Sequence, residues 1–234
     1  MVFLQERKEI KPFVMRVLIL LLICISSLSL YSQSIEVFGG ANRNLFYGKK
    51  DANYSYFTAN YQAGDGFTAG IGIDSLHINR FRMRFALQFD QYNGGFNAES
   101  NSGKAVYQRA MGEIVKSVVS LGFFPLNFTI KKKLDLNFGA EVSSLLNENV
   151  SGTGFYESLV EGEPVTYGLS DHYDRYSTRA TYGLKSRMAY SLALSKILLI
   201  PQYSFYYGLS SEFREFPEAA KSMRHSLCIG IKMK

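Results

Sequence analysis

The chain has 234 residues, with 47% hydrophobic and 15% aromatic side chains and a formal net charge of +6. This length allows one large all-β domain or two small domains, and the hydrophobic content excludes an intrinsically disordered protein. The basic excess is small and scattered along the chain, which argues against nucleic acid as a partner.

The first 32 residues have the features of a cleavable secretory signal peptide. Basic side chains precede an apolar run over 17–25, and small polar residues lead to a predicted cleavage site after Ser32. Met15 is an alternative start of translation, because the residues after it form a complete signal. An uncleaved anchor is the other interpretation, but the apolar run is shorter than the roughly 18 residues of a spanning helix. The remaining chain, 33–234, keeps one cysteine, Cys228, and therefore has no internal disulfide.

Residues 81–89 read Phe-Arg-Met-Arg-Phe-Ala-Leu-Gln-Phe. Bulky apolar side chains alternate there with polar or small ones, which gives a strand one apolar face and one polar face. The same alternation recurs over 134–142 and 182–190. In chain order the sequence predicts eight strands, over 35–47, 66–75, 80–91, 113–124, 133–146, 177–192, 196–209 and 222–233.

The connections between these strands alternate strictly between long and short. The long ones are 48–65, 92–112, 147–176 and 210–221, and the short ones are 76–79, 125–132 and 193–195. Outer-membrane barrels have long loops outside, short turns on the periplasmic side and an even number of strands. Residues 33–234 are therefore predicted to form one all-β domain, an eight-stranded antiparallel up-and-down transmembrane β-barrel in an outer membrane.

The predicted strands carry Phe, Leu, Ile and Met on one face, and charged residues, glycine and serine on the other. A soluble lipocalin-like barrel would turn the apolar face inward. However, the interior of eight strands is just wide enough for packed side chains, and these large residues would overfill it. We therefore expect the apolar face to contact lipid. Four apolar residues break the alternation, namely Phe38, Val118, Leu198 and Ile200.

The opposite face places many charges in the predicted lumen. The expected network consists of Arg82, Arg84, Asp90, Lys116, Glu141, Arg179, Lys185 and Arg187. Unpaired charge in a narrow interior is costly, so pairing is expected. The set predicts a salt-bridged plug, and a cation-lined conduit for a small anion is the alternative.

Three connections carry a compositional bias. The acidic loop 147–176 could bind a divalent cation or a basic partner, although a solvated surface is the simpler interpretation. The loop 48–65 is rich in tyrosine and could pack on other loops or present an adhesive patch. Three lysines, Lys131–Lys133, mark the predicted periplasmic rim, where they could meet anionic headgroups.

Residues with catalytic chemistry are sparse and separated. The three histidines, His77, His172 and His225, are predicted at different levels of the barrel. His225 is followed by Ser226, but adjacent strand residues point to opposite faces and do not form a catalytic pair easily. We expect no catalytic residue, cofactor or metal, and hence a protein that is not an enzyme.

With a signal ending Tyr-Ser-Gln and eight alternating strands that run to the last residue, the chain resembles the outer-membrane β-barrel family of Bacteroidetes-type bacteria. That family includes PorT-like proteins and is similar to the small OmpA- and OmpX-type barrels. The chain departs from many such barrels in ending Ile231-Lys232-Met233-Lys234 rather than in an aromatic residue.

The resemblance implies a monomer, or a subunit of a larger membrane complex, whose partners are outer-membrane lipid and envelope proteins that contact the outer loops. The predicted role is in envelope structure or surface interaction. The alternatives are an accessory barrel of a secretion system, as the PorT-like resemblance suggests, then a lipid-modifying enzyme, then a soluble carrier.

Overall fold

The computed structural model describes residues 34–47, 57–78, 81–101, 106–158, 162–169, 177–213 and 220–233. The chain divides into two units, residues 1–33 and 34–234, and all described residues belong to the second unit. The predicted signal peptide therefore lies outside the described residues. No helix in the described ranges is long and apolar enough to cross a bilayer.

The described chain is almost entirely β-structure. Its ten strands are β1 (Ser34–Tyr47), β2 (Phe57–Ile78), β3 (Phe81–Asn101), β4 (Val106–Ile130), β5 (Leu134–Ser158), β6 (Gly162–Gly168), β7 (Ala180–Tyr190), β8 (Leu192–Leu194), β9 (Ile197–Gly208) and β10 (Lys221–Met233). Every pairing between them is antiparallel.

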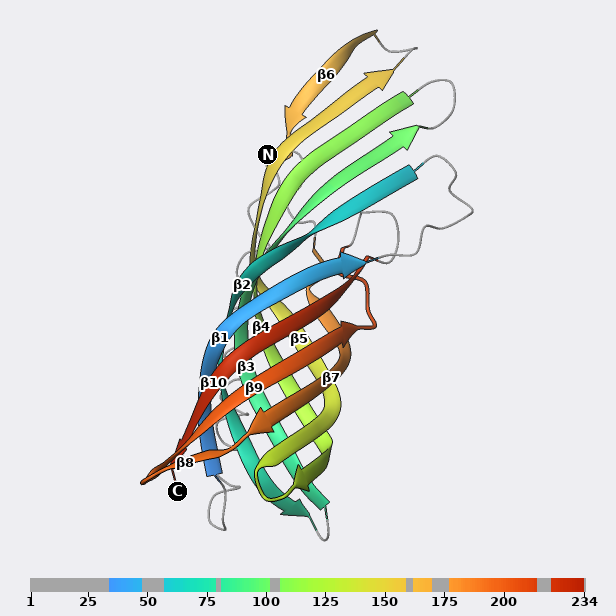
Figure 1. The fold of residues 1–234 in the computed structure, drawn as a ribbon. Coiled ribbons are helices and arrows are strands. Elements are labelled where there is room, and N and C mark those ends of the chain that lie inside the picture. Colours follow the sequence, from blue (N-terminus) through green and yellow to red (C-terminus); the bar gives the residue numbers. More distant parts are fainter. Residues whose placement is uncertain are drawn as a thin grey trace, which may run out of the picture. The chain divides into compact units, whose positions relative to one another are not determined.

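Eight of these strands form a closed ring (Figure 1). Its order is β1-β2-β3-β4-β5-β7-β9-β10, and the pairing of β10 with β1 closes it. At the closure, Phe38 of β1 lies opposite Gly230 of β10 on one side and Gly70 of β2 on the other. The short strands β6 and β8 lie outside the ring, paired with β5 and β9. The prediction of an eight-stranded up-and-down antiparallel barrel is confirmed.

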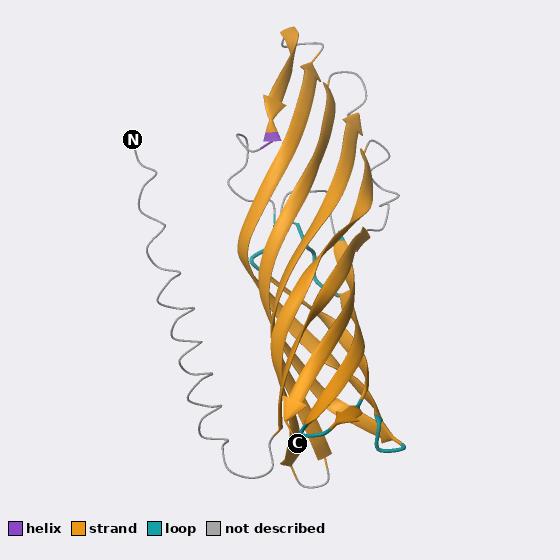
Figure 2. Ribbon diagram, turned by 60° about the vertical axis from the view of Figure 1, so that its left-hand side comes forward, coloured by secondary structure: helices purple, strands orange, loops and turns teal. Residues whose placement is uncertain are grey.

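The prediction of three long outer connections was partly wrong. Much of 48–65, 92–112 and 147–176 is strand, because β2 to β5 continue beyond the ends of the other ring strands and β6 pairs with β5. Figure 2 shows these strands rising past the barrel as one curved sheet. We call the part made by 57–65, 93–101, 106–114, 146–158 and β6 the projecting sheet. Its glycine and polar residues resemble a loop in composition, but along β3 every second residue from Tyr92 to Ala98 is buried on one face.

The wall of the ring has its apolar residues outside and its polar residues inside. On β10, Leu227 is 68% exposed and its neighbour Cys228 is 7% exposed. Exposed side chains on the outer face include Ile35, Val37, Phe67, Ile71, Leu121, Phe138, Val142, Tyr182, Leu184, Met188, Ile229 and Ile231. Buried polar side chains on the inner face include Thr68, Gln88, Asn137, Ser143, Gln202 and Ser226. A lipocalin-like barrel requires the opposite arrangement and is excluded.

Apolar residues that broke the predicted alternation help to fill the lumen. Phe38, Val118 and Ile200 are all buried there, while Leu198 is half-buried. The ring of Phe38 lies against Gly70, since a Cβ at that glycine would come within 2.6 Å of it. The lumen therefore accommodates the Phe38 ring because the residue facing it is glycine.

Two turns define one end of the barrel, which we call the turn end; the opposite end is the loop end. Residues 131–133 join β4 to β5, and 195–196 join β8 to β9. In the first turn, the Lys133 nitrogen donates to the Ile130 carbonyl at 3.1 Å, and Lys131 and Lys132 have φ angles of 50° and 58°. Positive φ at both central positions is typical of a type I′ turn, which favours Asn-Gly. For other residues this conformation costs roughly 1–2 kcal/mol each.

Candidate functional site: the charged lumen

The first tier of the lumen network lies near the turn end and centres on Glu36. Its carboxylate accepts hydrogen bonds from Arg84 at 3.0 Å and from Arg187 at 2.8 Å. The Gln202 amide donates to the same carboxylate at 2.9 Å. Arg84 also pairs with Asp74, which Lys232 approaches at 3.6 Å at the rim. Side chains from three strands, β3, β7 and β9, thus converge on one fully buried carboxylate of β1.

Two glycines make room for this tier. A Cβ at Gly72 would lie 2.6 Å from the Arg84 guanidinium carbon, and a Cβ at Gly230 would lie 2.9 Å from the Glu36 carboxyl carbon. Real side chains do not approach this closely, so the ion pair fits only because β2 and β10 carry glycine at these positions.

The second tier lies in the middle of the barrel and links four charged groups. Arg224 donates to Asp90 at 2.8 Å and also pairs with Glu141, which in turn pairs with Lys185. Neutral neighbours complete it: Asp90 accepts from Thr68 at 2.5 Å and from Gln88 at 2.7 Å. Such charge-assisted bonds are the strong class of hydrogen bond, and they satisfy carboxylates that water does not reach.

The third tier holds a loop against the loop end. Lys116 of β4 donates to the Glu212 carboxylate at 3.0 Å, and Ser222 of β10 donates to it at 2.5 Å. Burial by itself raises the pKa of Glu212, but the Lys116 ammonium and the hydrogen bond from Ser222 outweigh it and hold that pKa below its usual value. The ammonium also lies 4.3 Å from the centre of the Phe213 ring, within cation–π range.

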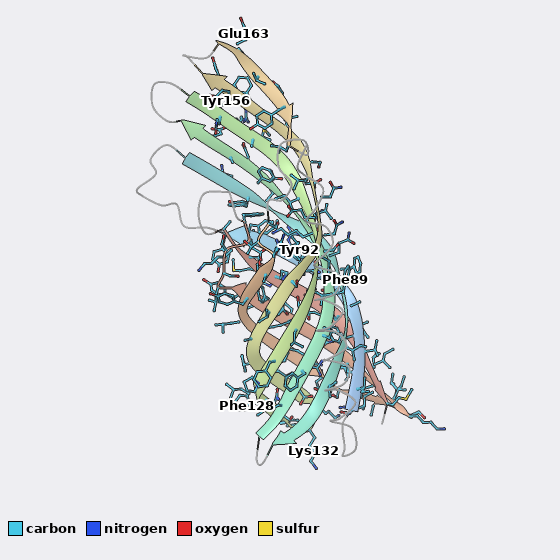
Figure 3. The ribbon with its side chains drawn as sticks, turned by 180° about the vertical axis from the view of Figure 1, so that it is seen from behind. Phe89, Tyr92, Phe128, Lys132, Tyr156 and Glu163 are labelled. Atoms are coloured by element: carbon cyan, nitrogen blue, oxygen red, sulfur yellow. The ribbon has the colours of Figure 1, made fainter. Side chains whose placement is uncertain are left out.

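An apolar cluster covers this third tier, and we call it the cap. It consists of Phe46, Tyr92, Phe96, Ala98, Ile114, Val118, Val150, Leu169, Phe213 and Ala220. Tyr61 stacks on Phe213 with ring centroids 6.1 Å apart, so the predicted tyrosine-rich connection does pack on another loop. Figure 3 labels Tyr92, which lies where the projecting sheet leaves the ring. The lumen is thus closed by ion pairs inside and by packed apolar groups at the loop end.

The buried ion pairs of the described lumen contain equal numbers of positive and negative side chains. The ion pairs join five buried cations to five carboxylates, and Lys232 adds the longer contact at the rim. A conduit for anions needs unpaired cations along its length, so this balance favours the plug. The five cations are Arg84, Lys116, Lys185, Arg187 and Arg224, and the carboxylates are those of Glu36, Asp74, Asp90, Glu141 and Glu212.

Six of the eight residues expected in the network lie inside the lumen, namely Arg84, Asp90, Lys116, Glu141, Lys185 and Arg187. Arg179 is exposed instead; it precedes β7, which begins at Ala180. The side chain of Arg82 lies outside the described part. Sequence reasoning missed the carboxylates of Glu36 and Glu212. It placed Asp74 and Arg224 on the inward face but did not include them in the network.

Other chemistry considered from the sequence is not assembled in the described ranges. His225 is exposed on the outer wall, where its Nδ1 lies 2.6 Å from the Tyr203 hydroxyl, while Ser226 is buried in the lumen. No group of three His, Cys, Asp or Glu able to hold a metal ion occurs among the described residues. In the acidic connection, Glu148 accepts from the Ser177 nitrogen at 2.9 Å.

An apolar wall around a charged, filled lumen defines an outer-membrane β-barrel. No protein-family model matches this chain, and no curated protein sequence does either. The chain is similar in structure to small outer-membrane barrels that have been solved.

Among these is Neisserial surface protein A, with 15% identity, a TM-score of 0.36 and coverage of 87% of this chain and 99% of that one. OprG from Pseudomonas aeruginosa has 9% identity, a TM-score of 0.41 and coverage of 86% and 96%. Ail of Yersinia pestis, solved with the heparin analogue sucrose octasulfate, has 15% identity, a TM-score of 0.35 and coverage of 86% and 97%. Each TM-score is below 0.5, so the chain's own wall and lumen carry the assignment to this class.

Proposed function

We propose that this chain is a closed, non-enzymatic outer-membrane barrel that acts through the sheet it displays outside the membrane. The observation that carries the proposal is the ion-paired lumen. Charges that a conduit would need for an ion are already bound to one another. Membership of the PorT-like family, and with it an accessory role in secretion, stays a prediction.

The projecting sheet supports the second half of the proposal. Its inner face is used by the cap, whereas its outer face along β3 and β4 carries the charged residues Glu99, Arg109 and Glu113 beside an exposed methionine, Met111. The Arg109–Glu99 pair on this face, at 3.3 Å, is about 40% exposed on each side. Closed barrels need only short connections, so an ordered sheet outside the ring is better explained by contact with another envelope or surface molecule.

Conductance tests the closed lumen directly. The purified protein is inserted into planar bilayers beside an open porin as the positive control. We expect no conductance steps from this barrel under conditions in which the porin gives them. Regular steps with a fixed unit conductance would overturn the closed-lumen proposal.

A shortened protein tests the displayed sheet. The register places Ala98 opposite Ala110 and Gly154 opposite Tyr167, so replacing 99–109 and 155–166 by two-residue turns removes the tip while keeping the cap. We expect the shortened barrel to insert and to restore detergent resistance, but to lose surface-dependent phenotypes of a deletion strain. Full complementation of every phenotype would instead assign the protein a purely structural role.

A further inference from the structure

The turn end carries a basic patch that the lumen and the projecting sheet do not use. Lys131, Lys132 and Lys133 form the β4–β5 turn, and Lys196 lies in the β8–β9 turn; all four are exposed. The first turn contacts the junction of β7 and β8, where the Ser191 nitrogen donates to the Lys133 carbonyl at 2.8 Å, and β8 leads from there to the second turn. We call these four lysines the turn-end patch.

Acidic residues of the described chain do little to neutralise the turn-end patch. Within the described residues, none of the four lysines has an ion pair. The nearest acidic residue in sequence, Asp135, already accepts the Thr129 hydroxyl at 2.6 Å. Four positive charges on two turns at the same end of the barrel therefore face outward without a counterion from this part of the chain.

Lipid-facing residues lie directly beside these charges. Ile130 precedes the first turn and is 46% exposed, while Leu194 precedes the second and is 51% exposed. Figure 3 shows Lys132 at the tip of the hairpin, beyond Phe128, which is itself 54% exposed. Cationic groups immediately past the apolar wall lie at the level of lipid headgroups.

The backbone of the first turn gives an independent argument. Lys131 and Lys132 occupy the positive-φ positions that Asn-Gly would fill without strain. A turn selected only for joining two strands has no need of lysine there. Strain held at named residues points to a use for their side chains.

We propose that the turn-end patch binds the phosphates of anionic glycerophospholipids in the periplasmic leaflet. The lysine ammonium groups supply the charge, and the apolar residues beside them contact the acyl chains of the same lipid. This inference depends on the membrane orientation of the wall and is independent of whether the lumen is closed.

The test compares association of phosphatidylglycerol and phosphatidylcholine with the folded barrel, using spin-labelled lipids in vesicles of the two. A basic residue near an anionic surface strengthens attraction about fivefold, so the four lysines together should give a preference of tenfold or more for phosphatidylglycerol. The preference should fall as salt rises. If the barrel shows no preference for phosphatidylglycerol, or a preference that does not change with salt, the proposal is overturned. This test needs no variant.

Variants assign the preference to the patch. Lys131→Asn with Lys132→Gly installs the favoured turn, and adding Lys133→Gln with Lys196→Gln removes the remaining charges. We expect the double variant to be more resistant to urea yet less selective, and the quadruple variant to lose its selectivity. A purely structural role for the lysines would not move stability and lipid selectivity in opposite directions.

The matched control changes basic residues at the loop end, Arg43→Gln with Lys221→Gln, and should leave the preference intact. Gel mobility before and after boiling checks that each variant is folded. Should a neutral variant fail to fold, Lys131→Arg with Lys132→Arg must keep the preference. Equal loss in the loop-end control, or binding to isolated peptidoglycan with no lipid preference, would overturn the proposal.

Discussion

Replacing Glu36 by glutamine removes the charge at the centre of the first tier with little change of volume. Arg84 keeps its pair with Asp74 after this change. Arg187 has no second carboxylate hydrogen bond among the described residues and keeps only amide partners, including Asn137 at 2.8 Å. A buried charge that loses its partner costs about 3–5 kcal/mol. Because Arg187 keeps its amide contacts, we expect Glu36→Gln to lower the free energy of unfolding by about 3 kcal/mol, the lower end of this range.

The assay is equilibrium unfolding in urea, followed by the mobility difference between folded and unfolded protein on unboiled gels. The control is Arg43→Gln, which breaks the pair with Asp65 at 3.3 Å, where both side chains are more than 60% exposed. An exposed pair of this kind contributes less than about 1 kcal/mol. Removing both buried partners, with Glu36→Leu and Arg187→Met, should recover most of the loss. A Glu36→Gln loss no larger than that of Arg43→Gln would refute the reasoning.

Two further predictions concern the packing of the lumen and the Lys116–Glu212 ion pair, which we call the latch. Gly72→Ala should destabilise the barrel by about 1–3 kcal/mol in the same urea assay, because its Cβ displaces Arg84. Gly39→Ala should change it little, since its Cβ meets only an ordinary contact at 3.6 Å; equal losses would contradict the packing argument. The lowered pKa of Glu212 means that its latch is stable above the ordinary carboxylate range and is released as pH falls through the lowered pKa. The protection of the 209–213 amides, which is their exchange corrected for its intrinsic dependence on pH, should therefore fall only in acid, whereas Glu212→Gln should lower it already at neutral pH. Protection that does not change with pH in the unmodified protein would argue against the latch.

The strands of the ring were predictable because a strand has a period of two and each face meets a different solvent. Residues such as Arg84 and Glu141 alternate with apolar neighbours, so their inward direction follows from the sequence. Glu36 alternates in the same way between Ile35 and Val37. It was left out because Phe38, an apolar residue on the inner face, obscured the pattern of that strand.

The rest of the site depends on tertiary contacts that periodicity does not encode. Glu212 lies in a connection without regular alternation, and only the return of that segment over the barrel brings it to Lys116. The projecting sheet contains Gly94 and Gly95 after Asn93, a composition typical of turns. These residues are strand because β2 and β4 pair with them on both sides.

Lipid contact along β10 tests the direction of the wall most directly. Single cysteines are placed at 226, 227, 228, 229 and 231 in a Cys228→Ser background, and each is spin-labelled in vesicles and exposed to oxygen, which dissolves in the bilayer. We expect high oxygen accessibility at 227, 229 and 231 and low accessibility at 226 and 228, since Leu227, Ile229 and Ile231 are exposed and Ser226 and Cys228 are buried. The opposite phase, with the even positions facing lipid, would contradict the account.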